Sequence, residues 1–237
     1  MTNLSSEILD PLMAANPAGP RITYYDDATG ERIELSTVTL ANWAAKTGNL
    51  LRDELAAGPA SRVAVLLPAH WQTAAVLFGI WWIGAEVVLS GDEADVALCT
   101  VDRLDEAYAA VGMGEVVVLS LDPFGKPVPD LPVGVTDYAT SVRVHGDQVV
   151  PERAPGPALD GRSADEVLAA ARASAAAQGL TAADRVASTA GWGTAEELVA
   201  NLLAVYVTGA SLVQMANPDA SLLERRSVNE KLTRSIP

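Results

Sequence analysis

The most apolar stretch of the chain, AAVLFGIWWIGA at residues 74–85, predicts a helix that is buried on all sides. It is too short to cross a bilayer, which needs about 20 residues, so we expect a core helix rather than a membrane contact. The run RVAVLLP at residues 62–68 precedes it, and EVVLS at residues 86–90 follows it. Continuous apolar runs are typical of strands covered on both faces. The three segments therefore predict a strand–helix–strand unit with parallel strands.

The alternation of strands and helices extends in both directions from this unit. DVALCT at residues 95–100 and EVVVLS at residues 115–120 predict two further strands, with a helix from about Val101 between them. ITYYD at residues 22–26 and RIELS at residues 32–36 predict a hairpin, because a polar turn joins them. Strands that alternate with helices favour a mostly parallel sheet.

An amphipathic helix is predicted between the hairpin and the first buried strand. Its apolar positions recur at spacings of three and four: Leu40, Trp43, Ala44, Thr47, Leu50, Leu51 and Leu55. Ser36, Thr37 or Thr39 can cap its start, and Gly58-Pro59 ends it. A shorter helix is expected at about residues 6–15.

Residues 122–162 differ in character from the rest of the chain. They are rich in proline and glycine and predict a loop-dominated connector with one short helix. Regular structure resumes at Ser163, which forms a capping box with Glu166 at the start of an alanine-rich helix over residues 164–178. Gly179 is expected to end that helix.

The remaining segments predict a second, smaller α/β unit. DRVAST and SLVQM (residues 211–215) are its strands, with a helix over residues 194–207 between them. A final amphipathic helix from about Asp219 is expected to turn four side chains inward: Leu222, Leu223, Val228 and Leu232. We expect it to cover a sheet surface, unless a second copy of the chain or another protein does so.

The fold class predicted is therefore layered α/β, a mostly parallel sheet with helices on both faces. The sheet is expected to run from about Ile22 to Ser120, and the second unit from about Ser163. This divides the chain into an N-terminal α/β unit at residues 1–121, a connector at 122–162 and a smaller α/β unit at 163–237.

Composition and charge narrow the function classes. Sixteen basic and 30 acidic residues give a net charge of −14, which repels nucleic acid and anionic membranes. Cys99 is the only cysteine, which excludes an intramolecular disulfide and disfavours a cysteine-based zinc site. The first residues lack the basic and apolar regions of a secretory signal, so a cytoplasmic location is expected.

Several blocks of sequence together resemble a known family. They are Thr23-Tyr24, the leucine and alanine positions of the helix after it, RVAVLLP, Gly84-Ala85 with the strand that follows, GLTAADRVAST at residues 179–189, and TGASLV at residues 208–213. In this order they resemble the N-terminal half of the adenylate-forming (AMP-binding) superfamily, which includes the acyl-CoA synthetases. The resemblance covers residues 20–120 and 163–216, and most of the matching positions belong to the scaffold.

The chain departs from that family where ATP would bind. Family members carry a glycine-rich loop with a run of Ser and Thr and a lysine, whose backbone N–H groups hold phosphates. PERAPGPALDG at residues 151–161 stands in its place, with two glycines and no lysine. The later family motifs fall beyond residue 216 and are not expected. We therefore expect neither ATP nor AMP as cofactor, and no catalytic residue.

These departures favour a non-catalytic relative of the acyl-CoA synthetases, acting as a small-molecule-binding or protein-interaction module. The alternative is a truncated ligase that still binds or activates a carboxylic acid, with a second polypeptide supplying the missing parts. A purely structural subunit is a third possibility.

STAGWGT at residues 188–194 is the candidate ligand site. The resemblance implies that this segment lines the acyl pocket, which makes Gly191, Trp192 and Gly193 candidates for contact with a small acyl or aryl carboxylate. Glycines allow close approach of the backbone, and the indole offers a flat apolar face. The alternatives are a decayed phosphate loop, or a strand-to-helix turn whose tryptophan is packed in the core.

The other residues with reactive side chains favour structural roles. His70 follows a strand end, where a catalytic base is conceivable, but a helix cap or surface role is favoured. His145 has no partner by spacing, and two distant histidines predict no metal site. Cys99 lies in an apolar strand, which favours a buried thiol. The acidic residues Asp92, Glu93 and Asp95 favour a solvated loop over a cation site.

Overall fold

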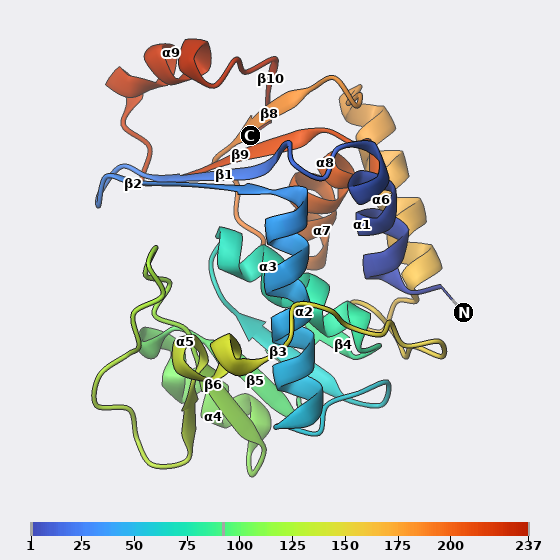
Figure 1. Ribbon diagram of the computed structural model, residues 1–237, viewed down its shortest axis with the longest axis vertical. Helices are drawn as coiled ribbons and strands as arrows, with labels where there is room; N and C mark the ends of the chain where they lie inside the picture. Colours follow the sequence, from blue (N-terminus) through green and yellow to red (C-terminus); the bar gives the residue numbers. More distant parts are fainter. Residues whose placement is uncertain (1, 92, 237) are drawn as a thin grey trace.

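The computed structural model describes residues 2–91 and 93–236 and contains two five-stranded sheets (Figure 1). In the first, which we call the parallel sheet, the order is β4-β3-β5-β6-β7 and each neighbouring pair is parallel. Its strands are β3 (Arg62–Leu66), β4 (Glu86–Val88), β5 (Val96–Cys99), β6 (Glu115–Val118) and β7 (Val135–Asp137). The predicted unit around the apolar helix is confirmed, because α3 (Trp71–Trp82) connects β3 to β4.

The second sheet, the mixed sheet, has the order β10-β8-β9-β1-β2, with only the β1–β2 pair antiparallel. Its strands are β1 (Pro20–Asp26), β2 (Glu31–Ser36), β8 (Arg185–Ser188), β9 (Ser211–Ala216) and β10 (Arg234–Ile236). The hairpin forms as predicted, but the expectation of one sheet from Ile22 to Ser120 is wrong. Residues Ile22 to Asp26 pair with β9 instead, so this sheet unites both ends of the chain.

Helices α2 (Thr37–Asp53) and α3 lie in the layer between the two sheets (Figure 1). This position explains why α3 has no polar face, since every residue from Trp71 to Trp82 is buried. The two helices approach closely at Gly79, where an added Cβ would lie 2.7 Å from the Ala44 carbonyl oxygen. Glycine is therefore needed here for close packing. Within the described residues, no helix is long and apolar enough to cross a membrane.

The other helices complete the layers. Helix α4 (Leu104–Val111), which follows the 3-10 turn η1 (Val101–Arg103), covers the far face of the parallel sheet. Helix α1 (Leu4–Ala15) packs on α3, and α6 (Ala164–Gln178) packs on α8 (Ala204–Val207). These contacts confirm the predicted layered α/β class.

The capping signals around α6 are confirmed. The Ser163 side chain accepts from the Glu166 N–H while the Glu166 carboxylate accepts from the Ser163 N–H. Gly179 ends the helix at a positive φ of 64°, a conformation that glycine adopts without strain. The helix expected over residues 194–207 is interrupted, because a π-helical turn, η3 (Val199–Leu203), separates α7 (Ala195–Leu198) from α8.

Residues 122–162 are mostly irregular, as predicted, but they also contribute β7 to the edge of the parallel sheet. A short helix α5 (Tyr138–Ser141) and a 3-10 turn η2 (Val142–Val144) follow this strand. The mixed sheet combines strands from before residue 121 with strands from after residue 162, so the sheets do not coincide with the predicted division of the chain. That division into domains stays a prediction.

The C-terminal segment lies on the outer face of the mixed sheet (Figure 1). Helix α9 (Ala220–Asn229) begins after its N-cap Asp219 as expected, and Leu232 packs inward as predicted, but the inward positions of Leu223 and Val228 are wrong. Leu223 and Val228 are 39% and 73% exposed, and the buried side chain of the helix is Arg226. The reason is that Asp27 and the Tyr25 ring receive Arg226, while the apolar cluster of Ala187, Val213 and Met215 is met by Leu232 beyond the helix.

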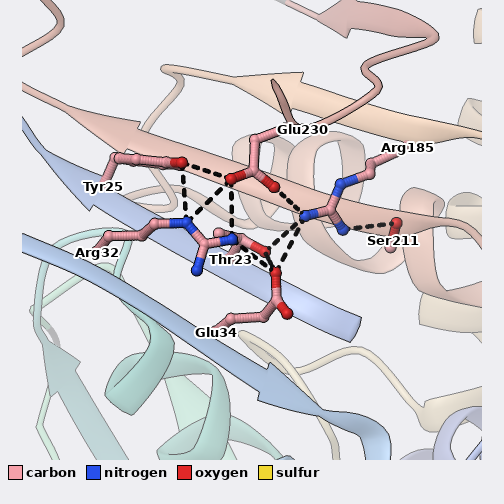
Figure 2. Close-up of polar contacts among 7 residues, drawn as sticks. All are labelled: Thr23, Tyr25, Arg32, Glu34, Arg185, Ser211 and Glu230. Carbon is pink, nitrogen blue, oxygen red and sulfur yellow. Dashed lines mark hydrogen bonds and ion pairs between the residues drawn. The ribbon is translucent and has the colours of Figure 1, made fainter. Parts of the chain in front are cut away.

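Two charged clusters hold this segment in place. Arg226 pairs with Asp27 at 2.5 Å, and its guanidinium lies 3.9 Å from the centre of the Tyr25 ring. Glu230 bonds to Tyr25, Arg32 and Arg185, as Figure 2 shows. The hydrogen bonds of Arg226 hold the pKa of Asp27 below its usual value, which keeps the pair ionised.

Candidate functional site

A groove of about 1320 Å³ lies between the two sheets, where the carboxyl ends of strands from both sheets meet. The residues that line it follow β3, β6 and β9 and surround the β1–β2 turn. In open α/β folds, loops diverge at this edge and leave room for ligands. We call this cavity the inter-sheet groove, and it is one of two cavities that are candidate sites.

His70 and Glu31 face each other in the inter-sheet groove. His70 Nε2 lies 3.7 Å from Glu31 Oε1, and these two buried atoms have no hydrogen-bond partner among the described residues. His70 Nδ1 accepts from the Gln72 N–H at 3.1 Å, so Nε2 carries the proton in the neutral ring. The Tyr24 ring packs edge-on against His70, with 4.3 Å between ring centres.

The position of His70 answers part of the sequence prediction. It caps α3, as favoured, but it is 2% exposed and therefore does not lie on the surface. Burial lowers the pKa of His70 because the charged ring loses hydration, although the nearby Glu31 opposes this. Glu31 belongs to the polar turn of the hairpin predicted from the sequence, and its contact with His70 arises only from the packing of the hairpin against the start of α3.

A pH dependence of stability follows from the buried His70. Its pKa is lower in the folded protein than in the unfolded chain, so stability is complete above about pH 6.5 and falls as the pH drops below it. His70→Asn keeps a capping side chain but removes the titration. Between pH 6.5 and 5.5, the free energy of unfolding should decrease by up to about 1.4 kcal/mol less in the variant than in the wild type. Urea unfolding from pH 5.5 to 8 measures this, and parallel curves would contradict it.

A smaller cavity of about 170 Å³ opens beside the inter-sheet groove and shares Pro123 and Phe124 with it. We call it the aromatic cavity. Its walls come from α2, α3, α5 and η2, and from the loop after β6. Four aromatic rings and one cation are among its lining residues: Trp43, Trp71, Phe124, Tyr138 and Arg143.

The aromatic cavity has a rigid frame. The Trp43 and Trp71 rings meet edge to face with 5.9 Å between their centres. Tyr138 OH shares a 2.7 Å hydrogen bond with Thr47 Oγ1, and burial raises the Tyr138 pKa to about 12, which keeps the phenol neutral. Phe124 is 80% exposed at the rim. The sequence places Trp43 in the apolar stripe of a helix and so predicts a core position. The one sequence feature that could indicate the cavity is the presence of Trp43 and Trp71 on two successive predicted helices.

The predicted segment Gly191–Gly193 follows β8 and precedes α7, as expected from the sequence. Trp192 is 3% exposed and belongs to the main core, while Gly191 and Gly193 are exposed. The Glu197 carboxylate accepts from the Gly193 and Thr194 N–H groups. A carboxylate of the chain itself therefore occupies the donors that a phosphate loop would use. The role of these residues in ligand contact stays a prediction.

The segment at residues 151–161 packs along the edge of the parallel sheet, where Leu159 forms a parallel bridge with Val87. Four of its backbone N–H groups donate hydrogen bonds to oxygen atoms of the chain. The N–H groups of Glu152, Gly156 and Asp160 donate to the carbonyl oxygens of Trp82, Gly84 and Val87, and that of Gly161 donates to Glu86 Oε1. A phosphate cradle needs such N–H groups to point together at the ligand. In this segment they bind the protein instead.

The other reactive residues lie apart from both cavities. Cys99 is buried as predicted, and burial raises its pKa to about 11, so the thiol stays protonated. His145 does have a partner, contrary to expectation, because its Nε2 lies 2.8 Å from Glu54 Oε1. Asp92 lies outside the described residues. Within residues 2–91 and 93–236, no group of three His, Cys, Asp or Glu side chains could hold a metal ion.

Three solved structures share this fold. An acyl-CoA synthetase of Brucella canis superposes with a TM-score of 0.80 at 18% identity over 99% of the chain. A benzoate CoA ligase of Burkholderia xenovorans gives 0.75 at 17% over 99%. The anthranilate CoA ligase AuaEII, in complex with anthranoyl-AMP, gives 0.72 at 16% over 97%. The fold is thus that of the N-terminal region of the adenylate-forming ligases, and the chain spans about half of each, 47%, 50% and 47%.

A full-length relative defines the family more narrowly. A TIGR03089 family protein of Mycobacterium tuberculosis is 71% identical over 99% of this chain and 98% of its own length. The chain therefore belongs to the TIGR03089 family. No protein-family model matches the sequence.

Proposed function

We propose that this protein is a non-catalytic relative of the adenylate-forming ligases that binds a small acyl or aryl carboxylic acid. The observation that carries the proposal is the hydrogen bonding of the backbone at residues 151–161. Their N–H groups bind carbonyl and carboxylate oxygens of the chain, so phosphates would have to displace a packed sheet edge. Buried backbone N–H and C=O groups need hydrogen-bond partners, so displacing this edge would cost free energy.

The electrostatics of this region support the same conclusion. Glu86 is 7% exposed and its carboxylate accepts from the Gly161 N–H at 2.6 Å. Asp165 and Glu166 occupy the first turn of α6, where a phosphate would otherwise meet the positive end of the helix dipole. A polyphosphate brought here would face three carboxylates. A cavity of about 480 Å³ lies beside residues 155–166, and these carboxylates make it unfavourable for the phosphates of a nucleotide.

The proposal predicts that the isolated protein does not activate carboxylic acids. ATP–pyrophosphate exchange should stay at the no-enzyme background with acetate, octanoate, benzoate and anthranilate, because the N–H groups of Glu152, Gly156, Asp160 and Gly161 already bind oxygens of the chain. The measurement is radiolabelled pyrophosphate incorporation into ATP. A matched positive control is a full-length acyl-CoA synthetase under the same conditions. Exchange above background that is lost in a Trp192 or Arg143 variant would refute the non-catalytic assignment.

A second candidate is a ligase completed by another polypeptide. It is favoured by the coverage of the solved ligases, since the chain matches 47–50% of their lengths. Under this alternative, a complex purified through a tagged copy of the chain would catalyse exchange while the isolated chain would not. Background exchange in both preparations would leave the non-catalytic function as the remaining candidate.

A further inference from the structure

We infer that the aromatic cavity is the ligand site, and that it takes an aryl carboxylate whose ring lies among Trp43, Trp71 and Phe124 and whose acid group pairs with Arg143. The inference rests on the proposed function, because it concerns a ligand that is bound and not converted. It adds the chemical class of that ligand and the cavity that binds it. The site differs from the Gly191–Gly193 segment, which lies after a strand of the other sheet.

The shape and lining of the cavity favour an aromatic ring. A volume of about 170 Å³ suits a single ring with a small substituent. Trp43 and Trp71 already meet edge to face, and a third ring can join them in the same geometry, which aromatic groups prefer. Phe124, 80% exposed at the rim, would gain a partner on binding.

The Trp71 side chain contributes an apolar wall to the cavity. Trp71 is 5% exposed and lines the cavity, yet its indole N–H has no hydrogen-bond partner among the described residues. A buried donor without an acceptor is uncommon in folded proteins, because leaving it unpaired costs free energy. Trp82 and Trp192 share this feature away from the cavity, and the Trp71 nitrogen has almost no accessible surface, so the indole contributes its ring face to the site and not its N–H group.

Charge determines the functional group of the ligand. Arg143 is the one charged side chain among the described residues that line the cavity. Its Nη2 donates to the carbonyl oxygens of Phe124 and Gly125, and the guanidinium makes no other hydrogen bond to a described residue. The remaining N–H groups can therefore form charge-assisted hydrogen bonds to a carboxylate. An amine would be repelled by the same group.

Hydrogen bonds fix the rim loop of the cavity at two positions. Gln72 Nε2 donates to the Asp122 carbonyl oxygen at 3.1 Å, which ties the start of the rim loop to α3. Arg143 ties Phe124 and Gly125 to η2. A site that is already shaped needs little ordering when the ligand binds, which favours affinity.

Titration with benzoate tests the inference by NMR of the five tryptophan indole N–H groups. The Trp71 and Trp43 signals should shift with saturation, while the Trp192 signal should not. Trp43→Phe, Trp71→Phe and Trp192→Phe variants assign the three signals. A shift confined to Trp192, or no shift at millimolar benzoate, would overturn the inference.

Two variants with matched controls test the contacts. Arg143→Gln should weaken benzoate binding about tenfold and leave benzamide binding unchanged, because only benzoate carries the charge. Arg153→Gln, at an exposed arginine outside the cavity, is its control. Phe124→Ala should weaken both ligands about fivefold, with the exposed Val144→Ala as control. Equal affinities in variants and controls would overturn the inference. Pyrophosphate exchange above background would refute the proposed function instead, and would leave these affinities unaffected.

Discussion

Trp192→Ala should lower the free energy of unfolding by about 3–5 kcal/mol, because it removes a large side chain from a packed interior and leaves a cavity. The indole is 3% exposed and contacts the main core. Urea unfolding followed by circular dichroism measures the loss. Trp192→Phe, which fills most of the space, should lose much less.

This experiment also separates the two interpretations of the Gly191–Gly193 segment. If Trp192 is a core residue, a folded Trp192→Phe variant should bind benzoate as the wild type does. If the indole forms the ligand site, the alanine change should cost little stability and abolish benzoate binding. The second result would restore the site predicted from the sequence and refute the aromatic cavity.

Arg226→Leu should destabilise the protein by about 3–5 kcal/mol, the effect expected when one partner of a buried ion pair is removed. The side chains of Arg226 and Asp27 are 8% and 7% exposed, so the remaining carboxylate would be buried without its counter-charge. The change also removes the contact of the guanidinium with the Tyr25 ring. Thermal and urea unfolding measure the effect.

The double variant Asp27→Asn/Arg226→Leu is the matched control, since it removes both charges together. It should recover a large part of the lost stability, because no unpaired charge remains buried. Arg225→Leu, at the exposed neighbouring position, should change stability by less than about 0.5 kcal/mol. A double variant no more stable than Arg226→Leu would show that the ion pair is not what holds α9.

Local signals explain which parts of the fold the sequence could predict. The capping box of Ser163 and Glu166, and the helix end at Gly179, depend on residues within a few positions of each other. The buried strands and the apolar helix around Phe78 likewise depend on local hydrophobicity. Each of these features is confirmed.

Long-range pairing explains the errors. The hairpin was assigned to the nearest strands in the sequence, but Tyr24 pairs with Gln214. In α9, apolar periodicity points to Leu223 and Val228, but Arg226 is the buried side chain, because Asp27, directly after β1, pairs with it. Hydrophobic periodicity identifies the apolar face of a helix, but the surface that receives the helix determines which face is buried.

The same distinction applies to function. The sequence by itself determined the family resemblance and the loss of the phosphate-loop residues, since both depend on residue identity along a continuous segment. Only the tertiary structure decided that Glu31 meets His70 and that Trp43, Trp71 and Arg143 surround one cavity. These residues come from segments far apart in the chain. Their contacts arise from the packing of two sheets around shared helices, which no local pattern of residues specifies.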